Sequence, residues 1–155
     1  MSETVKLTRK RASEYVVNYN NGIKTLQYKW AGAKNGKEFT LPVPREVFDY
    51  LNMNTKAIKT GALVIADSQP DKDLIINEII EVEEYQANSH SRDEIIALLK
   101  GNINKMKKEL NLITSRQEKV FVKQIKDELA IGEGLNNTKS DFVDEWVKLK
   151  PEDTD

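Results

Sequence analysis

Two Asn-Gly dipeptides, Asn21-Gly22 and Asn35-Gly36, constrain how the first part of this chain can fold. Asn and Gly readily adopt the positive φ angles that the tight turn of a β-hairpin requires. A turn at each dipeptide divides residues 14–43 into three short runs that lie next to one another in sequence. Strands that are adjacent in sequence and joined by tight turns pair antiparallel.

The three runs have the composition of β-strands. Residues 14–19 are rich in β-branched and aromatic side chains. Residues 23–30 and 38–43 alternate between apolar and polar side chains, which is the pattern of a half-buried strand. Pro42 has no N–H to donate, so the third run should lie at the edge of a sheet. The pattern predicts a three-stranded antiparallel β-meander.

A short helix is predicted directly after these strands. Pro44 suits the start of a helix, and Val47, Phe48 and Leu51 follow at helical spacing, which indicates a helix over residues 44–52. Further along, residues 63–65 form an apolar run that is typical of a buried strand.

Residues 72–85 leave two alternatives open. Ile75, Ile79 and Val82 lie on one helical stripe, whereas two isoleucine pairs interrupt the alternation that a strand would need. We favour a helix for this segment.

The second half of the chain has the signals of a helical subdomain. Ser91 and Ser115 are each followed three residues later by glutamate, Glu94 and Glu118, which is the capping-box pattern of a helix start. Apolar residues at helical spacing follow both boxes, and a last predicted helix has Trp146 on its inner side.

Together these patterns predict an α+β fold, in which an N-terminal antiparallel β-meander with a short covering helix precedes a small C-terminal helical subdomain. We expect residues 1–12 to form a basic flexible arm and residues 13–86 the α+β domain. Residues 91–150 should form the helical subdomain, and residues 151–155 a disordered tail.

Composition excludes several classes of chemistry. The chain has no cysteine, which excludes disulfides, thiolate metal sites and cysteine nucleophiles, and it has one histidine, His90. His90 lies between two serines at a predicted helix start, so we expect a surface or capping residue. We expect a chain that is not an enzyme and that uses no cofactor or metal.

Membrane insertion and secretion are not expected. The apolar runs are only a few residues long, far short of the ~20 that span a bilayer. The N-terminal sequence has no apolar segment of the kind found in signal peptides. We therefore expect the cytosol of a host cell, or a virion.

The basic residues of the expected arm are the first candidates for binding. They are Lys6, Arg9, Lys10 and Arg11. The arm has three possible roles: a solvated tail, a segment that docks on a neighbouring subunit, or a segment that binds nucleic-acid phosphates. Stretches of opposite net charge alternate along the chain, which favours contacts between copies.

The second run of the meander contains the other candidates. Tyr28 and Trp30 share one face with Leu26, and lysines lie nearby in sequence: Lys24, Lys29, Lys34 and Lys37. Interleaved aromatic and basic side chains on a sheet can stack and hold single-stranded nucleic acid. The same face is also needed to build a core, and it could form a protein interface.

Three segments of the chain carry a resemblance to a known group of proteins. They are YKWAGAKNGKEFTLPVPREVFDYL, SHSRDEIIALLKGNINKMKKEL and the final FVDEW. The chain resembles small uncharacterised proteins of phages and prophages of low-GC Gram-positive bacteria. The resemblance implies a virion or assembly component, or a small protein that binds nucleic acid or a host protein.

The function that we expect is therefore a non-enzymatic, self-associating phage structural or assembly protein. Its partners would be further copies of the chain or other virion or assembly proteins. The alternative is a protein that binds single-stranded DNA through the basic arm and the first sheet. A third and weaker alternative is an inhibitor of a host enzyme.

Overall fold

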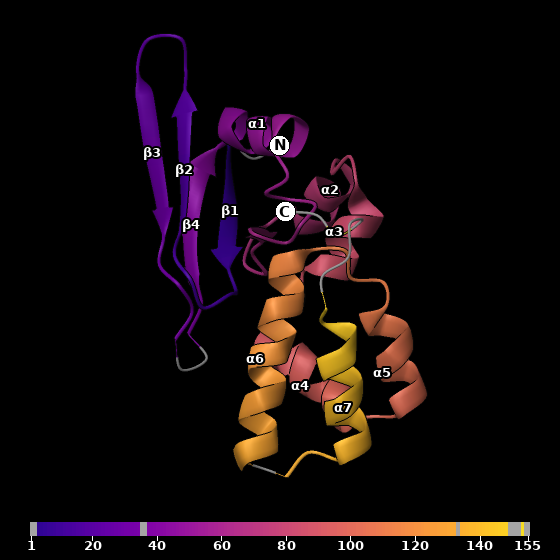
Figure 1. Cartoon of the computed structure of the whole chain (residues 1–155). Helices are drawn as coiled ribbons and strands as arrows, with labels where there is room; N and C mark the ends of the chain where they lie inside the picture. Colours follow the sequence, from indigo (N-terminus) through magenta and orange to yellow (C-terminus); the bar gives the residue numbers. More distant parts are fainter. Residues whose placement is uncertain (1–2, 35–36, 133, 149–152, 154–155) are drawn as a thin grey trace.

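The computed structural model describes residues 3–34, 37–132, 134–148 and 153. Strands and short helices form the first half of the molecule, and helices form the second (Figure 1). In chain order the elements are β1 (Thr4–Arg9), β2 (Tyr15–Asn20), β3 (Thr25–Trp30), β4 (Phe39–Pro44), α1 (Arg45–Asn54), β5 (Val64–Ile65), α2 (Lys72–Asn77), α3 (Val82–Asn88), α4 (Arg92–Lys100), α5 (Ile103–Leu110), α6 (Arg116–Gly132) and α7 (Asn137–Trp146). The α+β class, with N-terminal antiparallel strands and C-terminal helices, is confirmed.

The expected flexible arm is wrong for the part of residues 1–12 that the structure describes. Residues Thr4–Arg9 form β1, the middle strand of a three-stranded sheet with the order β4-β1-β5. Val5 and Leu7 are completely buried, and they lie opposite Val43 and Leu41 of β4. Because β1 contributes to the first hydrophobic core, that core begins before residue 13.

The hairpin of β2 and β3 forms as predicted, but the third strand has a different partner. The turn lies at Asn21-Gly22, where Gly22 has a φ of 94°. β4 pairs with β1 instead of continuing the meander from β3, and it lies at a sheet edge, as Pro42 requires. Asn35-Gly36 lies outside the described residues.

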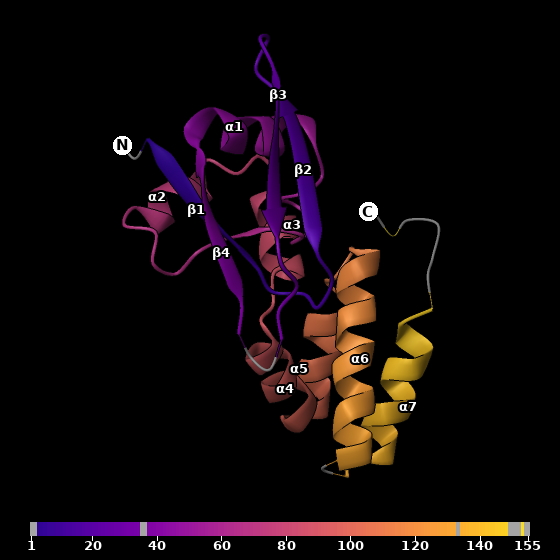
Figure 2. The same ribbon diagram turned by 90° about the vertical axis from the view of Figure 1, so that its left-hand side faces the viewer.

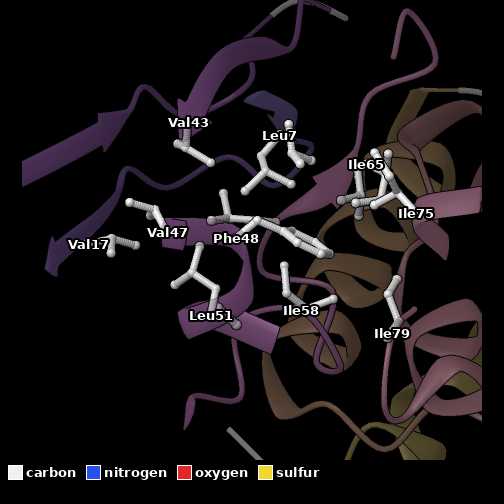
Figure 3. Close-up of a cluster of buried hydrophobic side chains, with 14 of the residues drawn as sticks. Leu7, Val17, Val43, Val47, Phe48, Leu51, Ile58, Ile65, Ile75 and Ile79 are labelled. Carbon is white, nitrogen blue, oxygen red and sulfur yellow. The ribbon is translucent and has the colours of Figure 1, made fainter. Parts of the chain in front are cut away.

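The first core lies between the strands and α1. Val47, Phe48 and Leu51 form the buried face of α1, and Phe48 points toward Leu7 and Ile58 in the middle of the cluster (Figure 3). Residues 72–85 are helical, as favoured, but they form two short helices, α2 and α3, with a break over residues 78–81. Ile75 and Ile79 from this region close the core.

The second core lies among α4–α7, which pack side by side below the strands (Figure 2). The capping box of Ser91 and Glu94 is confirmed, because each side chain accepts the other's backbone N–H. Trp146 and Phe121 belong to this core. Asp153 is the described residue of the expected disordered tail, and it is buried, which corrects that expectation for this residue.

Candidate functional site

Arg9 is a structural residue of the first domain rather than a free cation. The residue is 3 % exposed, and its guanidinium donates to the carbonyls of Ser13 and Ala62, both at 2.8 Å. The guanidinium also lies 5.2 Å from the centre of the Tyr15 ring. These contacts correct the expectation that Arg9 reaches a neighbour or a nucleic acid.

Arg11 is likewise turned inward, toward the junction between the two halves. It is 5 % exposed and donates to the carbonyl of Thr60 at 2.5 Å and to that of Asn88 at 3.3 Å. Its guanidinium also pairs with the Glu118 carboxylate of α6 at 3.2 Å. Arg11 therefore joins the end of β1 to a helix more than one hundred residues away.

Glu118 uses its carboxylate differently from the capping box that its position predicts. Its backbone N–H does donate to the Ser115 hydroxyl at 3.1 Å, as in a capping box. Its carboxylate instead pairs with Arg11 through Oε1 and with His90 through Oε2. The side chain is 1 % exposed, so this charge is stabilised by two basic partners from other segments rather than by water.

His90 is part of this cluster and not a surface residue, which corrects the expectation. Its ring Nδ1 lies 2.9 Å from Glu118 Oε2, and its backbone N–H donates to the same oxygen at 3.0 Å. Burial lowers the pKa of His90, but the hydrogen bond and negative charge of Glu118 outweigh burial, so the pKa is raised overall. We name Arg11, Asn88, His90 and Glu118 the polar joint.

Asn88 completes the polar joint with its side-chain amide, which is fully buried. Its Oδ1 accepts the backbone N–H groups of Thr114 and Ser115, and its Nδ2 donates to the Lys59 carbonyl at 3.0 Å. Gly61 passes so close that a Cβ there would lie 2.0 Å from the Asn88 carbonyl oxygen. Sequence reasoning missed Asn88 and Gly61, because neither belongs to a recognisable motif.

A cleft of about 950 Å³ opens beside the polar joint and has walls from both halves of the chain. Lys10, Glu38 and Asp67 line it from the first half, and His90 and Glu94 line it from the second. Loss of hydration raises the pKa of Glu38, Lys10 opposes the rise, and the neighbouring carboxylates of Asp67, Asp93 and Glu94 add to it. The cleft therefore has polar walls that contain both signs of charge.

The polar joint contains a carboxylate–histidine pair, an arrangement that also occurs in sites of general acid–base catalysis. A carboxylate holds one ring nitrogen of His90, which fixes the imidazole beside the cleft. Among the described residues, no group of three or more His, Asp or Glu side chains is placed to hold a metal ion.

The other candidate residues are dispersed. Trp30 is completely buried and its indole N–H donates to the Leu7 carbonyl at 3.0 Å, so its ring is core and cannot stack on a base. Tyr28, Lys6 and Lys10 are partly buried, and Lys10 lies 4.0 Å from Glu94. The exposed lysines lie on the hairpin and on the loop after it: Lys24, Lys29, Lys34 and Lys37.

None of the helices in the described part of the chain has the length and apolar character needed to cross a membrane.

Comparison with known proteins gives the same division into two parts. Residues 3–81 match the family model of the YonA N-terminal domain, and residues 91–153 match that of the YonA C-terminal domain. No curated protein and no solved structure is significantly similar to the chain. The polar joint contains residues from both matched regions, and it also contains Asn88 and His90 from the segment between them.

Proposed function

Since the chain belongs to the YonA family and contains both of its domains, we propose one function for the two together: a non-enzymatic, self-associating structural or assembly protein of a phage. The phage setting rests on the resemblance of the three quoted segments. Self-association rests on one observation, which is that β2 is an edge strand with an open backbone and no charged side chain.

The backbone groups at the open edge of β2 can be identified. The N–H of Asn21 donates to the carbonyl of Lys24, so this pair is hydrogen-bonded across the hairpin. Hydrogen-bonded and non-hydrogen-bonded pairs alternate along an antiparallel ladder. In the observed register, Val16, Asn18 and Asn20 therefore point their N–H and C=O groups away from β3. No strand among the described residues pairs with this edge.

The composition of β2 favours a second copy as the partner of this edge. Proteins usually protect an edge strand with lysine, proline or a bulge, and the sequence YVVNYN has no lysine and no proline. When β2 pairs antiparallel with β2 of a second copy, only uncharged side chains of the two strands face each other. Such a contact uses the same surface on both copies and closes a two-fold dimer.

The hairpin is also accessible. The β2–β3 hairpin extends past α1 and away from the rest of the molecule (Figure 1). Its tip is ordered by side-chain bonds, because Asn21 Oδ1 accepts the backbone N–H groups of Ile23 and Lys24. This tip holds Ile23 with 92 % of its surface exposed, which adds an apolar group beside the open edge.

The first experiment measures molar mass by light scattering for the intact protein and for Asn18→Lys. Asn18 is exposed, and a lysine there adds charge to the open edge of each copy. We expect the intact protein to exceed the monomer mass and Asn18→Lys to be shifted toward the monomer. Gln27→Lys is the matched control, because Gln27 lies opposite Asn18 on β3 and not on the β2 edge.

A monomeric intact protein at every concentration, or equal loss of assembly in both variants, would refute pairing through β2. The same measurement with added single-stranded DNA tests the alternative function. Of the candidate residues for that alternative, Arg9, Arg11 and Trp30 are buried in structural contacts. The exposed lysines of the hairpin and its following loop remain, together with the partly buried Lys6, Lys10 and Tyr28. A complex with DNA that weakens steeply with salt would favour the alternative over self-association.

A further inference from the structure

Lys119 is a buried lysine that pairs with a carboxylate from a distant part of the chain. It lies in the first turn of α6, its side chain is 5 % exposed, and its ammonium lies 2.9 Å from each carboxylate oxygen of Asp153. The Asp153 side chain is itself only 4 % exposed. Both members of this ion pair are therefore removed from water.

The wall of this site is aromatic. The Lys119 ammonium lies 5.5 Å from the centre of the Trp146 ring, close enough for the ring face to attract the cation. Trp146 is 8 % exposed and belongs to the second core, so its position is fixed by packing. α6 thus supplies a cation, and α7 supplies an aromatic ring that lies beside it.

Burial makes Lys119 depend on an anionic partner. An ion pair on the surface contributes little to stability, whereas a buried charge that loses its partner is strongly destabilising. Lys119 therefore needs a negatively charged oxygen ligand whenever it is buried. The two equal contacts of Asp153 show how a carboxylate meets that need.

We propose that Lys119 and Trp146 form a carboxylate-binding site that binds Asp153 either of its own chain, as observed here, or of a second copy. The contacts are the same in both cases, and exchange of an identical segment between copies is a low-cost route to association. Asp153 of the same chain competes at an effective concentration in the mM range. Asp153 of a second copy can therefore replace it only when the copies are held close together. This inference rests on the proposed self-association and adds a second contact to it.

The binding site can be tested without reference to oligomeric state. The probe is a labelled peptide of residues 149–155, added to the full-length Asp153→Asn variant, whose own segment can no longer neutralise Lys119. We expect this variant to bind the peptide at least tenfold more tightly than the intact protein does. Binding should be lost when the peptide carries asparagine at position 153, or when Lys119→Gln is added to the variant. Equal binding of the Asp and Asn peptides would overturn the proposal.

The exchange between copies is tested by mixing two full-length variants, Lys119→Gln and an affinity-tagged Asp153→Asn. Neither variant can form the ion pair within its own chain, but Asp153 of the first can pair with Lys119 of the second. We expect the tagged variant to capture Lys119→Gln. In the control mixture the double variant Lys119→Gln/Asp153→Asn replaces Lys119→Gln, so that no complete ion pair can form. A heterodimer yield no higher than in this control would overturn exchange. A monomeric intact protein whose Asp153→Asn variant binds the peptide would refute self-association and leave the carboxylate site standing.

Discussion

Glu118 holds two basic side chains with a single carboxylate that is 1 % exposed. Transfer of a carboxylate from water to a protein interior is strongly unfavourable unless the charge is paired and hydrogen-bonded. Arg11 and His90 supply that pairing, and each comes from a different segment of the chain. The polar joint is therefore a place where removal of one side chain leaves another charge without its partner.

The raised pKa of His90 makes stability depend on pH near neutrality. A pKa that is higher in the folded than in the unfolded state stabilises the fold fully below the unfolded value of about 6.5. This contribution is lost as pH rises through the folded pKa. We expect the free energy of unfolding of the intact protein, relative to that of His90→Gln, to fall as pH rises above about 6.5.

Chemical denaturation at a series of pH values measures this difference. The carboxylates that raise the pKa of His90 are Glu118, Glu94 and Glu109, and all are present in both proteins. The comparison therefore isolates the effect of removing the His90 imidazole. A difference between the two proteins that does not change with pH would contradict the assignment.

For single residues, the sequence shows which side chains can carry charge or cap a helix, but not which side chains they contact in the fold. The single histidine and the Ser115–Glu118 spacing were both visible in the sequence, but their meeting was not. The contact of Glu118 with Arg11 joins residues 107 positions apart, and local patterns contain no information on such a contact. The sequence predicts Arg9 and Arg11 in a flexible arm, as candidates to bind a partner or nucleic acid, whereas each is buried with several acceptors.

At the scale of elements, β1 is the strand that the sequence analysis did not predict. Its apolar residues Val5 and Leu7 alternate with Lys6, which is the pattern of a strand, but the cluster of basic residues after them suggested a solvated arm. The hairpin and α1 were predictable because Asn-Gly turns and helical spacing are local signals. The pairing of β4 with β1 was not, because it depends on which apolar faces meet in the core.

The turn that ends at Gly61 determines how closely the first domain approaches the polar joint. Gly61 has a φ of 74°, and a Cβ would meet the Asn88 carbonyl at 2.0 Å. Strain at positive φ costs roughly 1–2 kcal/mol, and overpacking adds roughly 1–3 kcal/mol. We expect Gly61→Ala to lower the free energy of unfolding by about 3 kcal/mol, as measured by urea denaturation.

Gly22→Ala is the matched comparison for this substitution. Gly22 also has a positive φ, of 94°, but nothing lies within 4 Å of its Cβ position. Strain at positive φ alone should lower the free energy of unfolding of this variant, by about 1–2 kcal/mol. Equal losses in the two variants would mean that the close approach to Asn88 has no energetic role.

At the scale of the whole molecule, two hydrophobic cores are connected through the polar joint. The first core contains Trp30 and the second contains Trp146, and these are the two tryptophans of the chain. Arg11 and Glu118 connect the cores as a buried pair, and removal of one partner of such a pair costs about 3–5 kcal/mol. Because both cores depend on the polar joint, we infer that they unfold together.

Glu118→Gln tests this cooperative unfolding, since it keeps the shape of the side chain but removes the charge that faces Arg11. The Trp146→Phe background leaves Trp30 as the fluorescent reporter of the first core, and Trp30→Phe leaves Trp146 as that of the second. With Glu118 present, the two reporters should give coincident denaturation curves in urea. In the Glu118→Gln variant the curves should separate, because each core then unfolds at its own stability. Curves that still coincide, at a stability lowered by less than about 1 kcal/mol, would show that the cores are coupled by contacts other than the Arg11–Glu118 pair.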